Sequence, residues 1–160
     1  MGGTKSFSLL VLLSLEQGEM AVTSKVYAQC LASLFNTEIS WTGNIKAMLC
    51  TSSYTPDQSA HRYMSQVTNE VTGTGYTAGG QTISISTPTV SSLTFSLPAS
   101  NASWSSSTIT ARYAVFYQWT GNASTSPLIA YWDFGADVSS SGGTFTLNIS
   151  SSGLLSSTVS

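Results

Sequence analysis

Any catalytic triad or Cys–His pair in this chain would depend on His61, its single histidine. Asp57 and Glu70 are near it in sequence, but no G-x-S-x-G motif singles out one of the many serines as a nucleophile. Arg62 follows His61 in a segment that favours a short surface helix. The pattern therefore predicts a structural histidine and no catalytic residue.

Asp133 and Asp137 are the carboxylates closest to the requirement of glycoside hydrolysis, in which two acidic side chains flank the scissile bond. Arg112, on the neighbouring predicted strand, offers Asp133 a partner, and Asp137 follows at the strand exit beside Ser and Gly. We interpret both carboxylates as structural, with Arg112 and Asp133 as an ion pair.

Cysteine and glycine positions give no metal or cofactor site. Cys30, Cys50 and the one histidine match no zinc-ligand spacing, and we expect both cysteines to be buried free thiols, with a single disulfide as the alternative. Gly73 and Gly75 resemble part of a phosphate loop but have neither a lysine nor a helix after them. No cofactor and no small-molecule substrate is predicted.

Composition limits the classes of partner. The chain has 160 residues, of which 8% are charged, and its formal net charge is -2. A charge this small does not attract a polyanion, which argues against nucleic-acid binding. Serine and threonine occupy the positions that charged residues usually hold. An uncharged, hydroxyl-rich surface suits a subunit of a large assembly or a protein displayed outside a cell.

The first 19 residues have two interpretations. Residues 7–15 (FSLLVLLSL) follow Lys5 as the apolar core of a signal peptide does, and they are too short to span a membrane. Residues 16–19 (EQGE), however, offer no small-residue cleavage site. Codons for Gln-Gly-Glu can contain a purine-rich ribosome-binding sequence, which favours Met20 as the start. We therefore expect residues 1–19 to be a leader or a misplaced start outside the fold, and residues 20–160 to form one β-rich domain.

Residues 107–136 predict a β-hairpin around which the rest of the chain is arranged. Apolar and polar residues alternate in its first half, its second half is apolar at nearly every position, and residues 120–127 are turn-forming. Closure at Asn122 places Arg112 opposite Asp133 and puts aromatic and aliphatic side chains on the other face.

The remaining pattern predicts a mainly β fold, an antiparallel β-sandwich or partly open barrel, with an N-terminal amphipathic helix and a second short helix. The expected segments in the first half are a helix over residues 23–35, a strand over 45–51, a turn over 52–59, a short helix over 60–66 and a shaped glycine loop over 73–80. The short helix is expected to bury Tyr63 and Val67. The second half is expected to add strands over 82–87, 90–97 and 144–150 and a last short strand at 154–155, with Leu93, Phe95 and Leu97 pointing inward from the strand over 90–97.

From Met20 onward the chain resembles a family of small virion structural proteins of tailed bacteriophages. The resemblance covers about seven-eighths of the chain, by the lengths in the sequence, and leaves residues 1–19 outside. Its residues are 21–27 (AVTSKVY), 45–46 (IK), 51–58 (TSSYTPDQ), 67–71 (VTNEV), 73–80 (GTGYTAGG), Trp104, 109–115 (ITARYAV), 126–129 (SPLI) and 133–135 (DFG).

The resemblance implies a virion component without enzymatic activity, most specifically a capsid decoration or cement protein on the outside of the head. Its partners would be the major capsid protein and copies of itself, with no membrane. Such a protein would act through many weak contacts repeated by symmetry. Aromatic and arginine side chains on loops are common interface anchors, which nominates Tyr54, Arg62, Tyr63 and Tyr76; the alternative is that they fold back onto this domain's own core.

Two other functions stay open. Some members of the family carry only a tail or general structural label, so a tail or fibre subunit is the closest alternative. A secreted or periplasmic carbohydrate-binding β-sandwich is a third, in which exposed Trp41, Trp119 and Trp132 would stack on sugar rings, although Trp132 is expected in the core.

Overall fold

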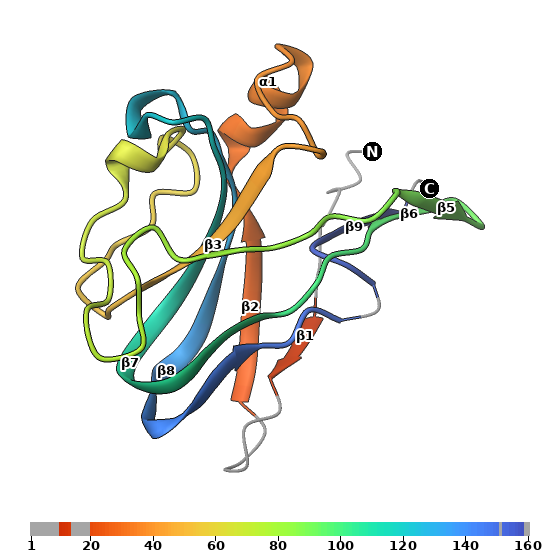
Figure 1. The fold of residues 1–160 in the computed structure, drawn as a ribbon. Helices are drawn as coiled ribbons and strands as arrows, with labels where there is room; N and C mark the ends of the chain where they lie inside the picture. Colours follow the sequence, from red (N-terminus) through yellow and green to blue (C-terminus); the bar gives the residue numbers. More distant parts are fainter. Residues whose placement is uncertain (1–9, 14–19, 151, 159–160) are drawn as a thin grey trace.

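The chain folds into antiparallel β-structure arranged as two sheets (Figure 1). The computed structural model describes residues 10–13, 20–150 and 152–158. The larger sheet has six strands in the order β1-β2-β8-β7-β3-β4, and the smaller has three in the order β5-β6-β9. The prediction of a mainly β, antiparallel fold is confirmed, and within the described residues the sheets do not close into a barrel.

The elements are β1 (Leu10–Leu13), β2 (Met20–Val26), α1 (Ala28–Phe35), β3 (Asn44–Cys50), the 3-10 helix η1 (Met64–Gln66), β4 (Gln81–Thr82), β5 (Thr89–Ser91), β6 (Thr94–Leu97), β7 (Ala102–Trp119), the 3-10 helix η2 (Ala123–Thr125), β8 (Leu128–Leu147) and β9 (Leu155–Thr158).

The long hairpin β7–β8 is the centre of the larger sheet, as residues 107–136 predicted (Figure 1). Its register differs from the prediction by one residue, because Tyr113 pairs with Asp133 and Ala114 with Trp132. The one-residue shift arises at an irregularity between Phe116 and Tyr117, because Tyr117 still pairs with Leu128 as the predicted closure requires. A second, larger irregularity, a bulge between Ala111 and Tyr113, leaves Arg112 out of the ladder. The strand expected at residues 144–150 is the continuation of β8.

The middle of this hairpin is buried on both faces. All four residues from Ala114 to Tyr117 are buried, as are all five from Leu128 to Trp132. Phe116 packs edge-on against Trp132, with ring centroids 4.8 Å apart. The alternation expected of a half-buried strand is therefore not found here, because the chain covers both sides of the sheet and strands so covered lose their alternation.

The N-terminal helix expected over residues 23–35 is not confirmed in that form. Met20–Val26 is a strand whose residues pair with β8, Thr23 opposite Asp133 and Val26 opposite Ala130, and α1 begins only at Ala28. Val22 and Val26 also fit a period of two, and the free edge of β8 favours the strand. Of the predicted leader, residues 1–9 and 14–19 lie outside the described residues, while Leu10–Leu13 forms β1 beside β2.

The second short helix is smaller than expected. Residues 60–63 are irregular, and only Met64–Gln66 forms a single 3-10 turn. The Gln66 side chain accepts hydrogen bonds from the backbone N–H groups of Arg62 and Tyr63, at 2.7 and 3.0 Å, and so holds the chain in a tight turn. Tyr63 and Val67 are half-buried.

The smaller sheet projects from the larger one (Figure 1). The strand expected over residues 90–97 is in fact the hairpin β5–β6, with Ser92 and Leu93 at its turn in positive-φ conformations. Leu93 is 66% exposed, which corrects its expected inward position. The last short strand is confirmed as β9, which pairs with β6. The strand expected over residues 82–87 is reduced to the two residues of β4 and one bridge between Ile85 and Ala99.

Candidate interaction surface

His61 lies in a stacked cluster of aromatic side chains. Its Nδ1 atom is 3.1 Å from the hydroxyl of Tyr54, which is 2.9 Å from the hydroxyl of Tyr27, and the His61 and Tyr54 rings stack at 6.0 Å. Burial raises the pKa of Tyr54 to about 12 and raises that of Tyr27 further. The hydroxyls thus stay protonated and join the residue before α1, the turn over residues 52–59 and the segment that precedes η1. This geometry holds the loops in a fixed orientation to one another.

Arg112 and Asp133 form an ion pair, with Arg112 Nε donating to Asp133 Oδ1 at 2.7 Å. The same carboxylate accepts a hydrogen bond of 2.8 Å from the backbone N–H of Gly135. Burial opposes ionisation of Asp133, but the hydrogen bonds from Arg112 and Gly135 outweigh it and lower the pKa of Asp133. Asp133 is thereby engaged in holding the bulge, and Asp137 is exposed.

Cys30 and Cys50 are buried and unpaired, which confirms the expectation of free thiols. Burial raises the pKa of Cys30 to about 12 and also raises that of Cys50, so both sulfurs stay protonated and unreactive at neutral pH. In the described part of the chain, no group of three or more His, Cys, Asp or Glu side chains is placed to hold a metal ion. The same residues include no helix with the length and apolar character needed to cross a bilayer.

Two of the four nominated interface residues are turned into the fold. Tyr54 is only 1% exposed, which corrects its expected role as a surface anchor. Tyr76 is half-buried and stacks on Trp104 at 5.8 Å. In both cases the phenol hydroxyl finds partners inside the fold, and the ring covers apolar neighbours.

Tyr76 connects the glycine loop to the sheet. Its hydroxyl donates to Glu70 Oε1 at 2.8 Å and accepts from the backbone N–H of Leu49 at 3.0 Å. Glu70 Oε1 also accepts from the N–H of Gly79 at 2.6 Å, and the Gly79 carbonyl accepts from Tyr117 at 2.7 Å. The glycines of residues 73–80 therefore shape a loop, as their spacing predicted, and these hydrogen bonds fasten the loop to β3 and β7.

Arg62 and Tyr63 stay partly accessible. Arg62 donates to Glu38 Oε1 at 2.7 Å, and its guanidinium lies 5.1 Å from the centre of the Tyr63 ring. Glu38 also accepts from the buried Ser33 hydroxyl at 2.8 Å, so this pair ties the end of α1 to η1. Both side chains can still contact a partner across their accessible faces.

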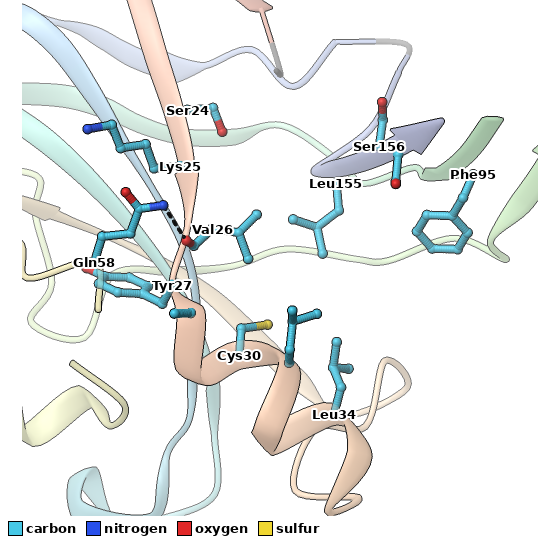
Figure 2. A pocket seen from close by; sticks show the side chains of 13 residues that line it. Ser24, Lys25, Val26, Tyr27, Cys30, Leu34, Gln58, Phe95, Leu155 and Ser156 are labelled. Carbon is cyan, nitrogen blue, oxygen red and sulfur yellow. Dashed lines mark hydrogen bonds between the residues drawn. The ribbon is translucent and has the colours of Figure 1, made fainter. Parts of the chain in front are cut away.

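A groove between α1 and the smaller sheet is the feature that sequence reasoning missed (Figure 2). Its volume is about 420 Å³. Leu34 and Cys30 of α1 form one wall, Leu155 and Phe95 of the smaller sheet form the other, and Val26 at the end of β2 lies between them. Lys25 is the one charged residue in its lining.

Large apolar side chains are exposed on the two elements that border this groove. Phe35, at the end of α1, is 87% exposed, and Leu31 is 51% exposed. Val90 and Leu93, on the β5–β6 hairpin, are 75% and 66% exposed. Leu31 and Phe35 belong to the apolar side expected of the amphipathic helix, a side that packs against a sheet or a neighbour. Their exposure makes this end of the molecule the candidate contact surface.

The tryptophans expected to bind sugar do not form an exposed set. Trp132 is fully buried, and Trp41 and Trp119 are half-buried and packed against the core.

Comparison with family models, with curated proteins and with solved structures gives no match to this chain.

Proposed function

We propose that this chain is a non-enzymatic structural protein of a tailed-bacteriophage virion, most specifically a decoration protein that binds the outside of the head and stabilises contacts between capsomers. The observation that carries the proposal is the exposure of Phe35, Val90 and Leu93 on a chain with very few charges. Side chains of this kind are stabilised when a protein partner covers them, at about 25 cal/mol per Å² of apolar surface.

The sequence resemblance directs that surface to a virion. The expected partners are the major capsid protein and further copies of this chain, on the surface of the capsid. Repetition of one small apolar contact at many symmetry-related positions gives strong retention from weak individual contacts. As part of the same proposal, the two sheets serve as an open β-sandwich that presents α1 and the β5–β6 hairpin at one end.

Reconstitution on heads tests the proposal. Purified chain is added to heads and to tails that lack it, and binding is measured by co-sedimentation and by electron microscopy. We expect saturable binding to heads. The variants Phe35→Ser and Leu93→Ser should lose most of it and still fold, because both side chains are already exposed.

Ser105→Ala is the matched control, since Ser105 is exposed on β7 in the larger sheet, outside the groove lining. Its binding should equal that of the unchanged chain. Binding to tails with none to heads would replace the proposal by the tail or fibre alternative. Binding to glycans, with none to either particle, would favour the carbohydrate-binding alternative.

A further inference from the structure

The outer edge of β5 is open to another strand. β5 is the last strand of the smaller sheet, with β6 on one side and no strand of the described residues on the other. The sheet projects from the rest of the molecule, and the β5–β6 hairpin lies at its far end (Figure 1). Thr89, Val90 and Ser91, the residues of β5, are all exposed. This edge is therefore accessible to a strand from outside the chain.

β5 lacks the features with which proteins usually prevent strand pairing at an exposed edge. Lysine or another charged residue, an inserted proline or a bulge commonly protects such an edge. This chain has no charged residue between Glu70 and Arg112, a stretch that includes all of β5 and β6. Pro88 precedes the strand, and the pairing of β5 with β6 is regular. The edge is thus uncharged and unprotected, and it bears Val90, which is 75% exposed.

The turn of the hairpin determines which backbone groups face this edge. Ser92 and Leu93 form a two-residue loop with φ of 47° and 69°, as in a type I′ turn. The residues that flank such a loop, here Ser91 and Thr94, form a hydrogen-bonded pair, and pairs alternate along the ladder. Val90 belongs to the next pair. Its N–H and C=O groups therefore point away from β6, towards the open edge.

A second copy of the chain brings a strand that fits this edge. If two β5 strands pair antiparallel about a two-fold axis at Val90, each Val90 exchanges both backbone hydrogen bonds with the other. Thr89 then lies opposite Ser91 of the second copy. Hydroxyl side chains already lie opposite one another throughout the smaller sheet, in the pairs Thr89–Ser96, Ser91–Thr94, Thr94–Thr158 and Ser96–Ser156. The two-fold pairing continues this pattern and brings no like charges together.

We propose that β5 pairs with β5 of a second copy, Val90 opposite Val90, and joins the two smaller sheets into one continuous sheet. The pairing uses the backbone of Val90 and leaves its side chain on the sheet face that it shares with Phe95. Two valines then lie side by side on that face, where a further partner can still contact them. The pairing is a property of the free chain and does not depend on the proposed attachment to heads.

Sedimentation equilibrium of the full 160-residue chain, at about 0.02 to 1 mM, tests the proposal. We expect a reversible equilibrium between monomer and dimer. Val90→Lys and Val90→Glu should each raise the dissociation constant about tenfold, because like charges then lie directly opposite each other. An equimolar mixture of the two variants should associate about as tightly as the unchanged chain, since lysine then faces glutamate. Restored association also shows that both variants fold.

Leu93→Lys is the matched control, because it adds the same charge to the same hairpin at a side chain that is 66% exposed but lies outside β5. Its dissociation constant should equal that of the unchanged chain. A chain that stays monomeric up to about 1 mM would overturn the proposal. Undiminished association of Val90→Lys, or a mixture that associates no more tightly than either variant alone, would do the same. No heads are used, so the proposed function is tested separately.

Discussion

At the scale of single residues, the ion pair of Arg112 and Asp133 shows how a side-chain contact can follow from sequence when the backbone register does not. The pairing was inferred from a register in which the two residues face each other across the hairpin. The irregularity between Phe116 and Tyr117 moves Tyr113 opposite Asp133, yet the long arginine side chain still reaches the carboxylate, with Arg112 Nε 2.7 Å from Asp133 Oδ1. A side chain that long tolerates a one-residue shift, and a short one would not.

Replacing Asp133 by Asn removes the charge but keeps an oxygen that can accept the Gly135 N–H. The two charged side chains are 27% and 31% exposed, so solvent screens the pair and we expect the free energy of unfolding to fall by about 1 kcal/mol at neutral pH. The pKa of Asp133 is lower in the folded state than in the unfolded state. Its stabilisation is therefore complete above the unfolded pKa of about 3.9 and is lost as the pH falls through the folded pKa.

Urea unfolding followed by tryptophan fluorescence, from about pH 7 down to about pH 2, measures this effect. The difference between the unchanged chain and Asp133→Asn should shrink towards zero at the acid end. Asp137→Asn is the control, since Asp137 is exposed, and it should follow the unchanged chain at every pH. A difference that persists undiminished at the lowest pH would mean that the charge of Asp133 is not what stabilises the fold.

At the scale of elements, the glycine loop over residues 73–80 could be foreseen from its sequence, although its contacts could not. Closely spaced glycines indicate positive φ, which Gly75, Gly79 and Gly80 adopt. Nothing in their spacing shows that Tyr76 would reach the backbone of β3 at Leu49. Contacts between segments far apart in sequence depend on which sheet edge the loop covers, and that is decided by the whole chain.

Gly80 is the position in this loop that least tolerates a side chain. Its φ is +70°, and a Cβ there would overlap the backbone of β3 at the Ala47 carbonyl oxygen. Both effects oppose substitution, so we expect Gly80→Ala to lower the free energy of unfolding by more than about 2 kcal/mol. Urea titration gives the value directly.

Gly143→Ala is the matched control for this substitution, because a Cβ at Gly143 meets nothing within 4 Å and its φ is not positive. Its effect should stay within about 0.5 kcal/mol. Equal effects of the two variants would show that the loop moves away from β3 at little cost, and that its contacts hold it only loosely.

The secondary structure at the start of the domain could not be predicted from its sequence pattern. Val26, Cys30 and Leu34 fit one face of a helix, and Val22 with Val26 also fits one face of a strand. The sequence allows both, and the open edge of β8 selects the strand up to Val26. The same competition explains Leu93, which was placed inward in a continuous strand but lies at a turn with positive φ.

At the scale of the whole molecule, the fold class could be predicted but the candidate surface could not. Alternating residues and turn signals repeat along the second half of the chain, and these local patterns suffice for a mainly β fold. The groove forms between α1, which ends at Phe35, and residues of the smaller sheet as distant in sequence as Phe95 and Leu155. Periodicity shows that α1 has an apolar side; only the assembled fold shows that Leu31 and Phe35 stay uncovered.

Charge across the whole molecule leads to a prediction about how it binds. The chain has five basic and seven acidic residues, and both of its arginines are engaged, Arg62 with Glu38 and Arg112 with Asp133. The attachment to heads that we propose, through Phe35, Val90 and Leu93, should therefore depend little on salt, because apolar contacts are not screened by ions. We expect the dissociation constant to change less than about twofold between roughly 0.05 and 0.5 M NaCl, whereas a protein held by several phosphate contacts would weaken by orders of magnitude.

Co-sedimentation of labelled chain with purified heads at increasing NaCl measures this dependence. Phe35→Ser should bind weakly at every salt concentration, which separates the loss of apolar contact from screening. Lys46→Ala, on a strand of the larger sheet, removes one positive charge and should bind as the unchanged chain does. A steep loss of binding with salt that Lys46→Ala makes shallower would mean that ion pairs hold the chain to the head. The exposed apolar side chains would then need another explanation, since covering them would no longer account for the attachment.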